Sequence, residues 1–186
     1  LLFIAIMLLS VGSAKSGISV GFDWLGKHKA TDIILDNYNL GNINSDVKSG
    51  LSLRMTTIPD LTQELSFGVG VEYQIGRETE DFDGDFYFQS FWGAVYSTLD
   101  KKLYGIGHLG YGSFKADKTY KGDGITILKG GLYYGIGLGM VYDETINIEG
   151  VYCTNFGSYD TYVLWEGDFI YDVEYKRLNI SIVYKI

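Results

Sequence analysis

Residues 64–75 read ELSFGVGVEYQI, and every second side chain from Leu65 to Ile75 is apolar. The residues between them are Glu, Ser, Gly or Gln. Because successive side chains of a β-strand point to opposite faces, this run predicts one apolar face and one small or polar face. Small and charged residues fill a polar interior better than a hydrophobic core, so we expect the apolar face to contact lipid.

The same alternation returns in residues 128–142 and, less regularly, along most of the chain, with little sign of a helix. It predicts an all-β fold, an antiparallel up-and-down transmembrane β-barrel of about eight strands with both termini on the periplasmic side. Short connections alternate with long ones, which indicates short periplasmic turns and longer extracellular loops. Two strands carry large side chains on both faces, and we expect a β-bulge in each, at 85–98 and 103–115. The expected strands are residues 16–25, 49–57, 65–75, 85–98, 103–115, 127–142, 145–156 and 169–186.

Composition agrees with a single β-domain, since the 186 residues include 25 Gly, 16 Tyr and one Pro. The formal net charge of −8 argues against a general nucleic-acid-binding surface. A lone Cys153 excludes an internal disulfide. Residues 1–14 are apolar and end in small residues, which predicts a truncated signal peptide that is removed on export. Residues 15–186 would then form the barrel domain, located in the outer membrane.

Charged side chains occur at several positions whose parity places them in the lumen. An eight-stranded barrel leaves an interior just wide enough for side chains. Since a buried charge is unfavourable unless it is paired, opposite charges should pair across this interior and plug it. The predicted lumen charge network consists of Arg54, Glu72, Lys129, Glu149 and Arg177.

Aromatic residues suggest two further surfaces. Tyr and Trp near the ends of membrane strands form interfacial girdles, because their amphipathic rings suit the headgroup level. The candidates with outward parity are Trp24, Tyr73, Tyr142, Tyr152 and Tyr184. In the predicted fourth loop, Tyr159, Tyr162 and Trp165 expose unusual apolar surface, which indicates either a surface contact site or packing against the barrel rim.

Candidates for chemistry are few. Residues 78–85 are rich in Asp and Glu and suggest calcium binding, but the spacing lacks the frame of a known calcium loop, so we expect a solvated acidic loop and no metal site. His28 falls in the predicted first loop and His108 in the fifth strand. No Ser or acid follows His108 at a spacing that would activate a nucleophile, so we expect no enzyme and no cofactor.

The chain resembles the small outer-membrane β-barrel proteins of the OmpA-transmembrane-domain, OmpX and opacity-protein type. The resemblance rests on residues 104–112, 135–152 and 178–186, the last of which is similar to the C-terminal assembly signal of such barrels. It covers essentially the whole mature chain. One departure is the terminal Ile186 where these proteins usually end in Phe or Trp, although Tyr184 two residues earlier is kept.

The leading interpretation is a non-enzymatic integral outer-membrane protein that supports envelope integrity and presents loops for contact or adhesion. A narrow channel or small-ligand transporter is the alternative. A soluble lipocalin-like barrel is the third interpretation and a lipid-processing enzyme the fourth. Expected partners are outer-membrane lipid and lipopolysaccharide, the barrel assembly machinery during insertion, and a host or surface ligand. We expect a monomer that binds no nucleic acid.

Overall fold

The computed structural model describes residues 15–33, 42–80, 84–117, 126–163 and 167–186, and almost all of them lie in β-strands. Within these ranges no helix is long and apolar enough to cross a bilayer. The strands are β1 (Ser16–Ile33), β2 (Asn42–Val47), β3 (Gly50–Thr57), β4 (Leu65–Gln74), β5 (Arg77–Glu78), β6 (Asp85–Thr98), β7 (Leu103–Ala116), β8 (Thr126–Val141), β9 (Ile146–Val163) and β10 (Gly167–Lys185).

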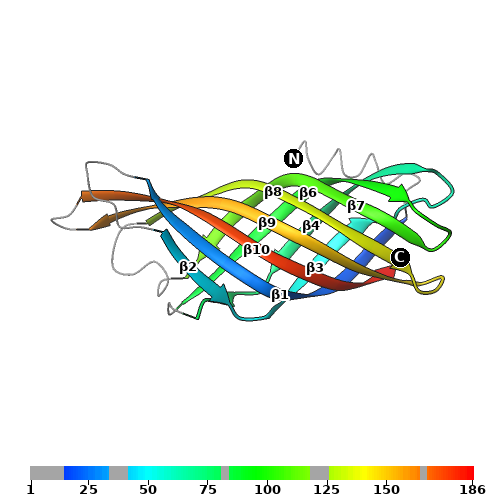
Figure 1. Ribbon diagram of the computed structural model, residues 1–186, viewed down its shortest axis with the longest axis horizontal. Coiled ribbons are helices and arrows are strands. Elements are labelled where there is room, and N and C mark those ends of the chain that lie inside the picture. Colours follow the sequence, from blue (N-terminus) through cyan, green and yellow to red (C-terminus); the bar gives the residue numbers. More distant parts are fainter. Residues whose placement is uncertain (1–14, 34–41, 81–83, 118–125, 164–166) are drawn as a thin grey trace.

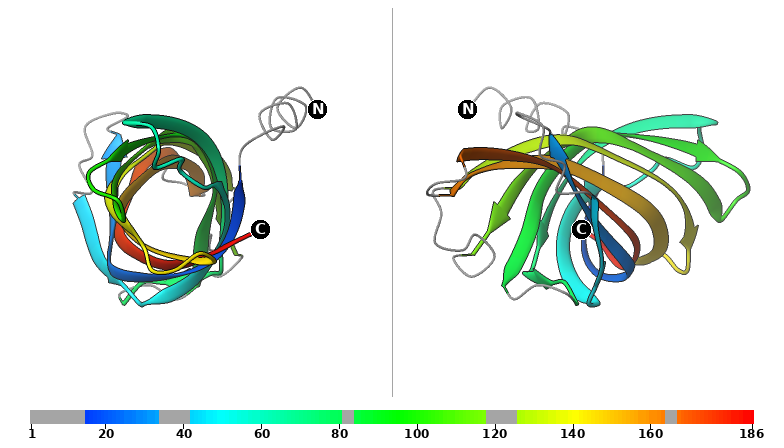
Figure 2. Two further views of the ribbon diagram at one scale, coloured as in Figure 1. Left: turned by 90° about the vertical axis from the view of Figure 1, so that its right-hand side faces the viewer. Right: turned by 60° about the vertical axis from the view of Figure 1, so that its left-hand side comes forward.

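The strands form one antiparallel sheet that closes on itself. Neighbouring strands follow the order β1, β3, β4, β6, β7, β8, β9 and β10, and β10 pairs with β1 to complete the ring. Figure 1 shows the inclined strands from the side, and Figure 2 shows the ring seen close to its axis. This architecture confirms the predicted up-and-down barrel with a ring of eight strands.

We call one end of the barrel the turn end, because it holds Ser16 and Lys185 together with the connections 58–64, 99–102 and 142–145. The opposite end, where the other connections lie, is the loop end. β1 extends from the turn end to the loop end, and beyond β3 it pairs with β2. β2 and β5 therefore continue the lines of β3 and β4 toward the loop end.

Two neighbouring strand lines are interrupted at the same level, between β2 and β3 and between β4 and β5. Arg77 fills this double break: its guanidinium donates to the backbone carbonyl of Leu51 at 2.7 Å and also to that of Ile75. Gly50 allows the close approach, because a Cβ there would lie 2.6 Å from the guanidinium. The Leu51 carbonyl also accepts from the Ile75 backbone N–H at 3.0 Å, so the guanidinium adds hydrogen bonds to the wall at the level of the break.

The strands at the loop end reach further than the sequence predicts. β1 continues to Ile33, which pairs with Ile170, and β9 continues to Val163, which pairs with Gly167. His28, expected in a loop, therefore lies in β1 with its side chain inward and buried. In the β1 extension, the inward His28 ring packs against Phe86 of β6 with centroids 5.0 Å apart.

The predicted bulges in the fourth and fifth strands are wrong. Pairing of β6 with β4 and β7 shows no register shift, and its even-numbered side chains are inward throughout. The inward aromatic side chains of β6 lie in an apolar part of the lumen. We had expected a polar lumen throughout, so large rings on this face suggested a bulge. Register shifts occur instead in β1 between Trp24 and Lys27, where Leu25 has a φ of 53°, and in β8 between Gly130 and Tyr133.

Candidate functional site

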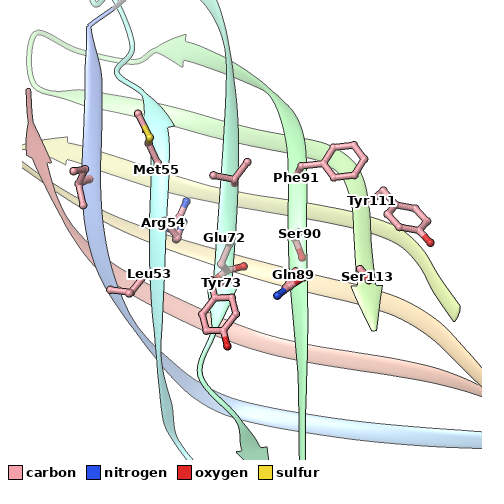
Figure 3. Close-up of a pocket in the computed structure, with 12 residues that line it drawn as sticks. Leu53, Arg54, Met55, Glu72, Tyr73, Gln89, Ser90, Phe91, Tyr111 and Ser113 are labelled. Carbon is pink, nitrogen blue, oxygen red and sulfur yellow. The ribbon is translucent and has the colours of Figure 1, made fainter. Parts of the chain in front are cut away.

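The outer wall is apolar over most of its height. Along β3 and β4, outward Leu53, Met55 and Tyr73 alternate with inward Arg54 and Glu72, as Figure 3 shows. A shallow groove of about 610 Å³ on this wall is lined by outward apolar and aromatic side chains such as these, with Gln89 and Ser113 among them. A surface of this kind is unfavourable in water and suited to a hydrocarbon surrounding.

Arg177 organises the middle of the lumen. It is fully buried, and its guanidinium donates to Glu72 Oε2 at 2.5 Å and to Asn155 Oδ1 at 2.5 Å. Its Nε also forms an ion pair with Asp23 Oδ1 at 3.1 Å. These partners come from β4, β9 and β1, so a single side chain from β10 links opposite parts of the wall.

Arg54 forms a second crossing of the lumen from β3. It donates to Asn179 Oδ1 at 2.9 Å and to Ser181 Oγ at 3.0 Å, both on β10. Its other guanidinium nitrogen lies 3.5 Å from Glu149 Oε2 on β9. Glu149 in turn accepts a hydrogen bond from the Tyr104 hydroxyl at 2.9 Å.

Two charged residues of this arrangement, Asp23 and Arg77, were not in the predicted network. Arg77 bonds Asp23 Oδ2 at 2.5 Å, and Asn179 donates to Asp23 Oδ1 at 2.6 Å. The inward parity of Asp23 was visible in the sequence, whereas Arg77 follows the expected strand 65–75 and precedes the acidic segment 78–85, so no strand parity placed it. We call the buried set the charge layer: Asp23, Arg54, Glu72, Arg77, Glu149 and Arg177.

Lys129 does not join the charge layer, and this corrects its predicted place in the lumen. Its side chain is 56% exposed and pairs with Asp160 on the outside of β9 at 2.7 Å. The bulge between Gly130 and Tyr133 reverses parity within β8, so that Leu128 faces the lumen. The parity read from the second half of the strand therefore fails in the first half.

One side of the lumen opposite the charge layer is apolar. Trp92, Tyr104 and Tyr133 are buried there, and the Arg54 guanidinium lies over the Trp92 ring at 5.4 Å from its centroid. Glycines on the inward face leave room for these rings: a Cβ at Gly70 would lie 2.4 Å from Trp92, and one at Gly139 would lie 2.2 Å from Tyr104. The glycines thus accommodate aromatic side chains of the neighbouring strands.

Nearer the loop end, a separate apolar cluster fills the lumen. Phe88 packs against Phe114 with ring centroids 5.0 Å apart, and Phe86 meets Tyr175 edge-on at 5.1 Å. The Tyr175 ring also lies under the Arg177 guanidinium, which connects the cluster to the charge layer. We call this set the aromatic core: Val47, Phe86, Phe88, Phe114, Val173 and Tyr175.

The five predicted girdle aromatics all lie on the outer wall. They are between 44% and 62% exposed. Tyr142 and Tyr184 are at the turn end, whereas Trp24 and Tyr152 lie at one level further along, each opposite Leu178. Their role at a membrane interface stays a prediction.

The predicted contact residues of the fourth loop are distributed differently. Tyr159 lies in β9, packs against the aromatic core and stacks on Tyr171 of β10 at 4.8 Å between centroids. Trp165 lies outside the described residues, and of Tyr162 only the backbone is described. In the acidic segment, Glu78 pairs with Lys48 at 2.5 Å and residues 81–83 lie outside the described ranges. Among described residues no cluster of potential metal ligands is found.

His108 is buried in the lumen against the apolar side. Its ring lies 4.8 Å from Trp92, and its Nδ1 is 3.3 Å from the Tyr133 hydroxyl, which also contacts Cys153 Sγ at 3.3 Å. None of the described carboxylates hydrogen-bonds this imidazole. The polar neighbour of the His108 imidazole is therefore the Tyr133 phenol.

Two turns at the turn end are held by aspartates. Asp60 accepts from the hydroxyl and backbone N–H of Thr62, and these bonds hold the pKa of Asp60 below its ordinary value of 3.8. Asp143 accepts from the backbone N–H and the hydroxyl of Thr145, which lowers its pKa in the same way. Both carboxylates are solvated and act as turn caps.

Comparison with known proteins places the fold. No protein-family model and no curated protein matches the sequence. Among solved structures, OprG of Pseudomonas aeruginosa is 14% identical with a TM-score of 0.56 and covers 93% of this chain and 96% of its own. Neisserial surface protein A is 14% identical with a TM-score of 0.53, covering 92% and 97%. Ail, the attachment invasion locus protein of Yersinia pestis, is 17% identical with a TM-score of 0.52, covering 93% and 99%. The chain therefore has the fold of the small eight-stranded outer-membrane β-barrels.

Proposed function

We propose that this chain is a non-enzymatic integral outer-membrane protein, which supports envelope integrity and presents its loop end for contact or adhesion. The observation that supports this most is the combination of an apolar outer wall with a lumen closed by buried ion pairs. A carrier of small apolar ligands needs the opposite arrangement, with a polar outside and an open apolar interior.

The contents of the lumen argue against the narrow channel that is the alternative function. Arg54 and Arg177 bridge opposite walls, and each is bonded to partners on two or more strands. Nearer the loop end, the aromatic core occupies the same passage with side chains such as Phe88 and Phe114 fully buried. A permeating ion would have to separate buried ion pairs without replacing them, which is unfavourable in a medium of low dielectric constant.

The contact function is proposed for the loop end because the sheet continues there beyond the apolar part of the wall. On β1 and β10 the outward residues of this extension include Lys27, Lys29 and Glu174, so it carries a charged surface. Ail of Yersinia pestis is by its name an attachment protein. For this chain, adhesion to a host or surface ligand, contact with lipopolysaccharide, insertion by the barrel assembly machinery and a monomeric state are parts of the proposal.

The first test is whether the mature chain folds only in detergent micelles or lipid. We expect a compact form that shifts its migration on a gel after heating, and aggregation in plain buffer. A soluble monomeric β-protein in buffer would contradict the proposal and favour a ligand-carrying barrel.

A second test separates the structural role from the channel. In planar bilayers we expect no steady conductance from the native chain, because the buried ion pairs and the aromatic core both fill the lumen. Regular single-channel steps from the native chain would favour the channel. The single variant His108→Ala should leave the lipid composition of the envelope unchanged, and altered lipid A would instead point to an enzyme.

A further inference from the structure

The outer wall changes from apolar to basic at one level on β1 and β10. On β1 the outward side chains are apolar up to Trp24 and continue with Lys27, and on β10 the change comes between Leu178 and Lys176. The register pairs Trp24 with Leu178 and Lys27 with Lys176. The two strands therefore share a boundary, which is where the headgroups of a surrounding lipid layer would lie.

A polar groove of about 480 Å³ opens on the wall just beyond this boundary. Its lining includes Lys27, Lys29 and Lys176, which we call the lysine patch, together with Asp46, Glu80 and Glu174. Lys27 pairs with Asp46 at 2.8 Å, and Lys176 pairs with Glu174 at 2.8 Å. Lys29 forms no ion pair with any residue in the described part of the chain.

Two of these ammonium groups are carried by residues directly opposite each other, since Lys27 and Lys176 are register partners in the β1–β10 ladder. Like charges directly opposite on one face of a sheet are destabilising, and the single carboxylate beside each ammonium group offsets part of this repulsion. A shared anion between the two lysines would offset more of it, and Lys29, which has no ion pair among the described residues, would supply a further donor from the next outward position of β1. The neighbouring acids keep the groove nearly neutral, so an anion in free solution would gain little from it.

We propose that the lysine patch binds a phosphate group on the headgroup of an outer-leaflet lipid. Lysine is a compact point charge that suits phosphate, and the flexible stem can follow a mobile headgroup. The lipid chains would lie on the apolar wall formed by outward side chains such as Leu178 and Ile180, so that one ligand contacts both sides of the boundary. This inference rests on the proposed function, because it requires the barrel to sit in a membrane.

The test compares phosphorylated lipid A with its dephosphorylated form as probes. The full mature chain, folded in detergent micelles, is titrated with each probe and the bound lipid is counted by native mass spectrometry. The patch variant is Lys27→Gln/Lys29→Gln/Lys176→Gln. A matched control with the same change of charge is Lys15→Gln/Lys101→Gln/Lys102→Gln, whose lysines are exposed at the turn end.

We expect the native chain and the control to prefer the phosphorylated probe, and the patch variant to lose the preference. Each lysine should contribute roughly a fivefold change in affinity. The single variant Lys29→Gln, which breaks no ion pair among described residues, should weaken binding by about that factor and should fold normally. Competition by inorganic phosphate alone would point to a free anion as the ligand and would overturn the lipid assignment.

Equal binding of both probes by the native chain, or an unchanged preference in the patch variant, would also overturn the inference while leaving the barrel function intact. Failure of the native chain to fold in detergent or lipid would instead overturn the proposed function. The two failures are distinguished by the heat-modifiable migration of the same samples.

Discussion

The charge layer and the aromatic core close the same lumen by different means. In the charge layer, Arg177 reaches Glu72 and Asn155 through hydrogen bonds and Asp23 through an ion pair, so its contacts depend on the register of four strands. In the aromatic core, Phe88 fills space against Phe114 and against Tyr175. The first therefore depends on charge and alignment, and the second depends on volume.

This difference shows how a small barrel can favour one strand register and also fill its lumen. A one-residue slip of β10 would move Arg177 to the outer wall and would leave Glu72 and Asp23 with one fewer partner, so the charge layer penalises wrong registers. Rings in the aromatic core tolerate small shifts, but they exclude water from the passage at the loop end. The Tyr175 ring contacts the Arg177 guanidinium, so the two parts are continuous.

The largest effect should come from removing the central arginine. In Arg177→Met, a side chain of similar length leaves Glu72 and Asp23 buried with a missing partner, and we expect a loss of about 5 kcal/mol in the free energy of unfolding. Urea titration in lipid vesicles, followed by tryptophan fluorescence, measures it. Adding Glu72→Leu should restore part of the loss, and no recovery would show that charge pairing is not the cause.

A slightly smaller effect is expected from emptying the aromatic core. Phe114→Ala removes a ring that is almost completely buried, and the loss should be about 3 kcal/mol because a site near the loop end can partly relax. The same urea titration applies. Unlike Arg177→Met, this variant should be rescued by filling volume, so Phe114→Leu should lie between it and the native chain. Equal losses for Leu and Ala would contradict a volume-dependent core.

An ion pair on the outer wall should matter far less than the buried pairs. Lys129→Met breaks the bond to Asp160, but the lysine side chain is 56% exposed and the pair is screened by solvent. We expect a change below about 1 kcal/mol, which should shrink further at high salt. A loss comparable with that of Arg177→Met would show that Lys129 acts inside the lumen, as the sequence had suggested.

The smallest effect should be an acid sensitivity of the turns, separate from both lumen regions. Because the pKa of Asp143 is lowered in the folded chain, its contribution to stability is present above the ordinary value of 3.8 and is lost as the pH falls through the lowered value. The protection of the Thr145 amide against hydrogen exchange, taken relative to the intrinsic rate at each pH, should therefore fall below pH 3.8. In Asp143→Asn, which keeps an acceptor but does not titrate, this loss of protection should be absent.

The sequence predicted the charge layer better than the aromatic core, for a physical reason. A charged side chain is unfavourable against lipid, so in an alternating strand it can face only the lumen. Arg54, Glu72 and Glu149 were therefore placed correctly by their parity. An aromatic residue is stable against lipid or in a packed interior, so Phe86 and Phe88 could not be placed by parity alone. Inward glycines such as Gly70 were seen as small lumen residues, whereas they make room for rings across the strand.

Local breaks in regularity account for the remaining errors. The bulge in β8 moved Lys129 to the outside, and nothing in a glycine pair marks which glycine is unpaired. Arg77 was missed because its strand line is interrupted just before it, and the sequence does not reveal that the guanidinium itself fills the interruption. The barrel was predictable from its many alternating residues, whereas these single positions depend on contacts between strands distant in sequence.

Arginine and lysine side chains occupy different parts of this protein, and this difference can be used in chemical labelling. Arg54, Arg77 and Arg177, the only arginines of the sequence, are all buried in the lumen, while no lysine that the structure describes is buried. Amine-reactive reagents should therefore label the folded protein without disturbing its interior. Guanidine-reactive dicarbonyls should react only after the wall opens. The rate of arginine labelling, compared with that of lysine labelling in the same sample, would therefore report unfolding in native membranes.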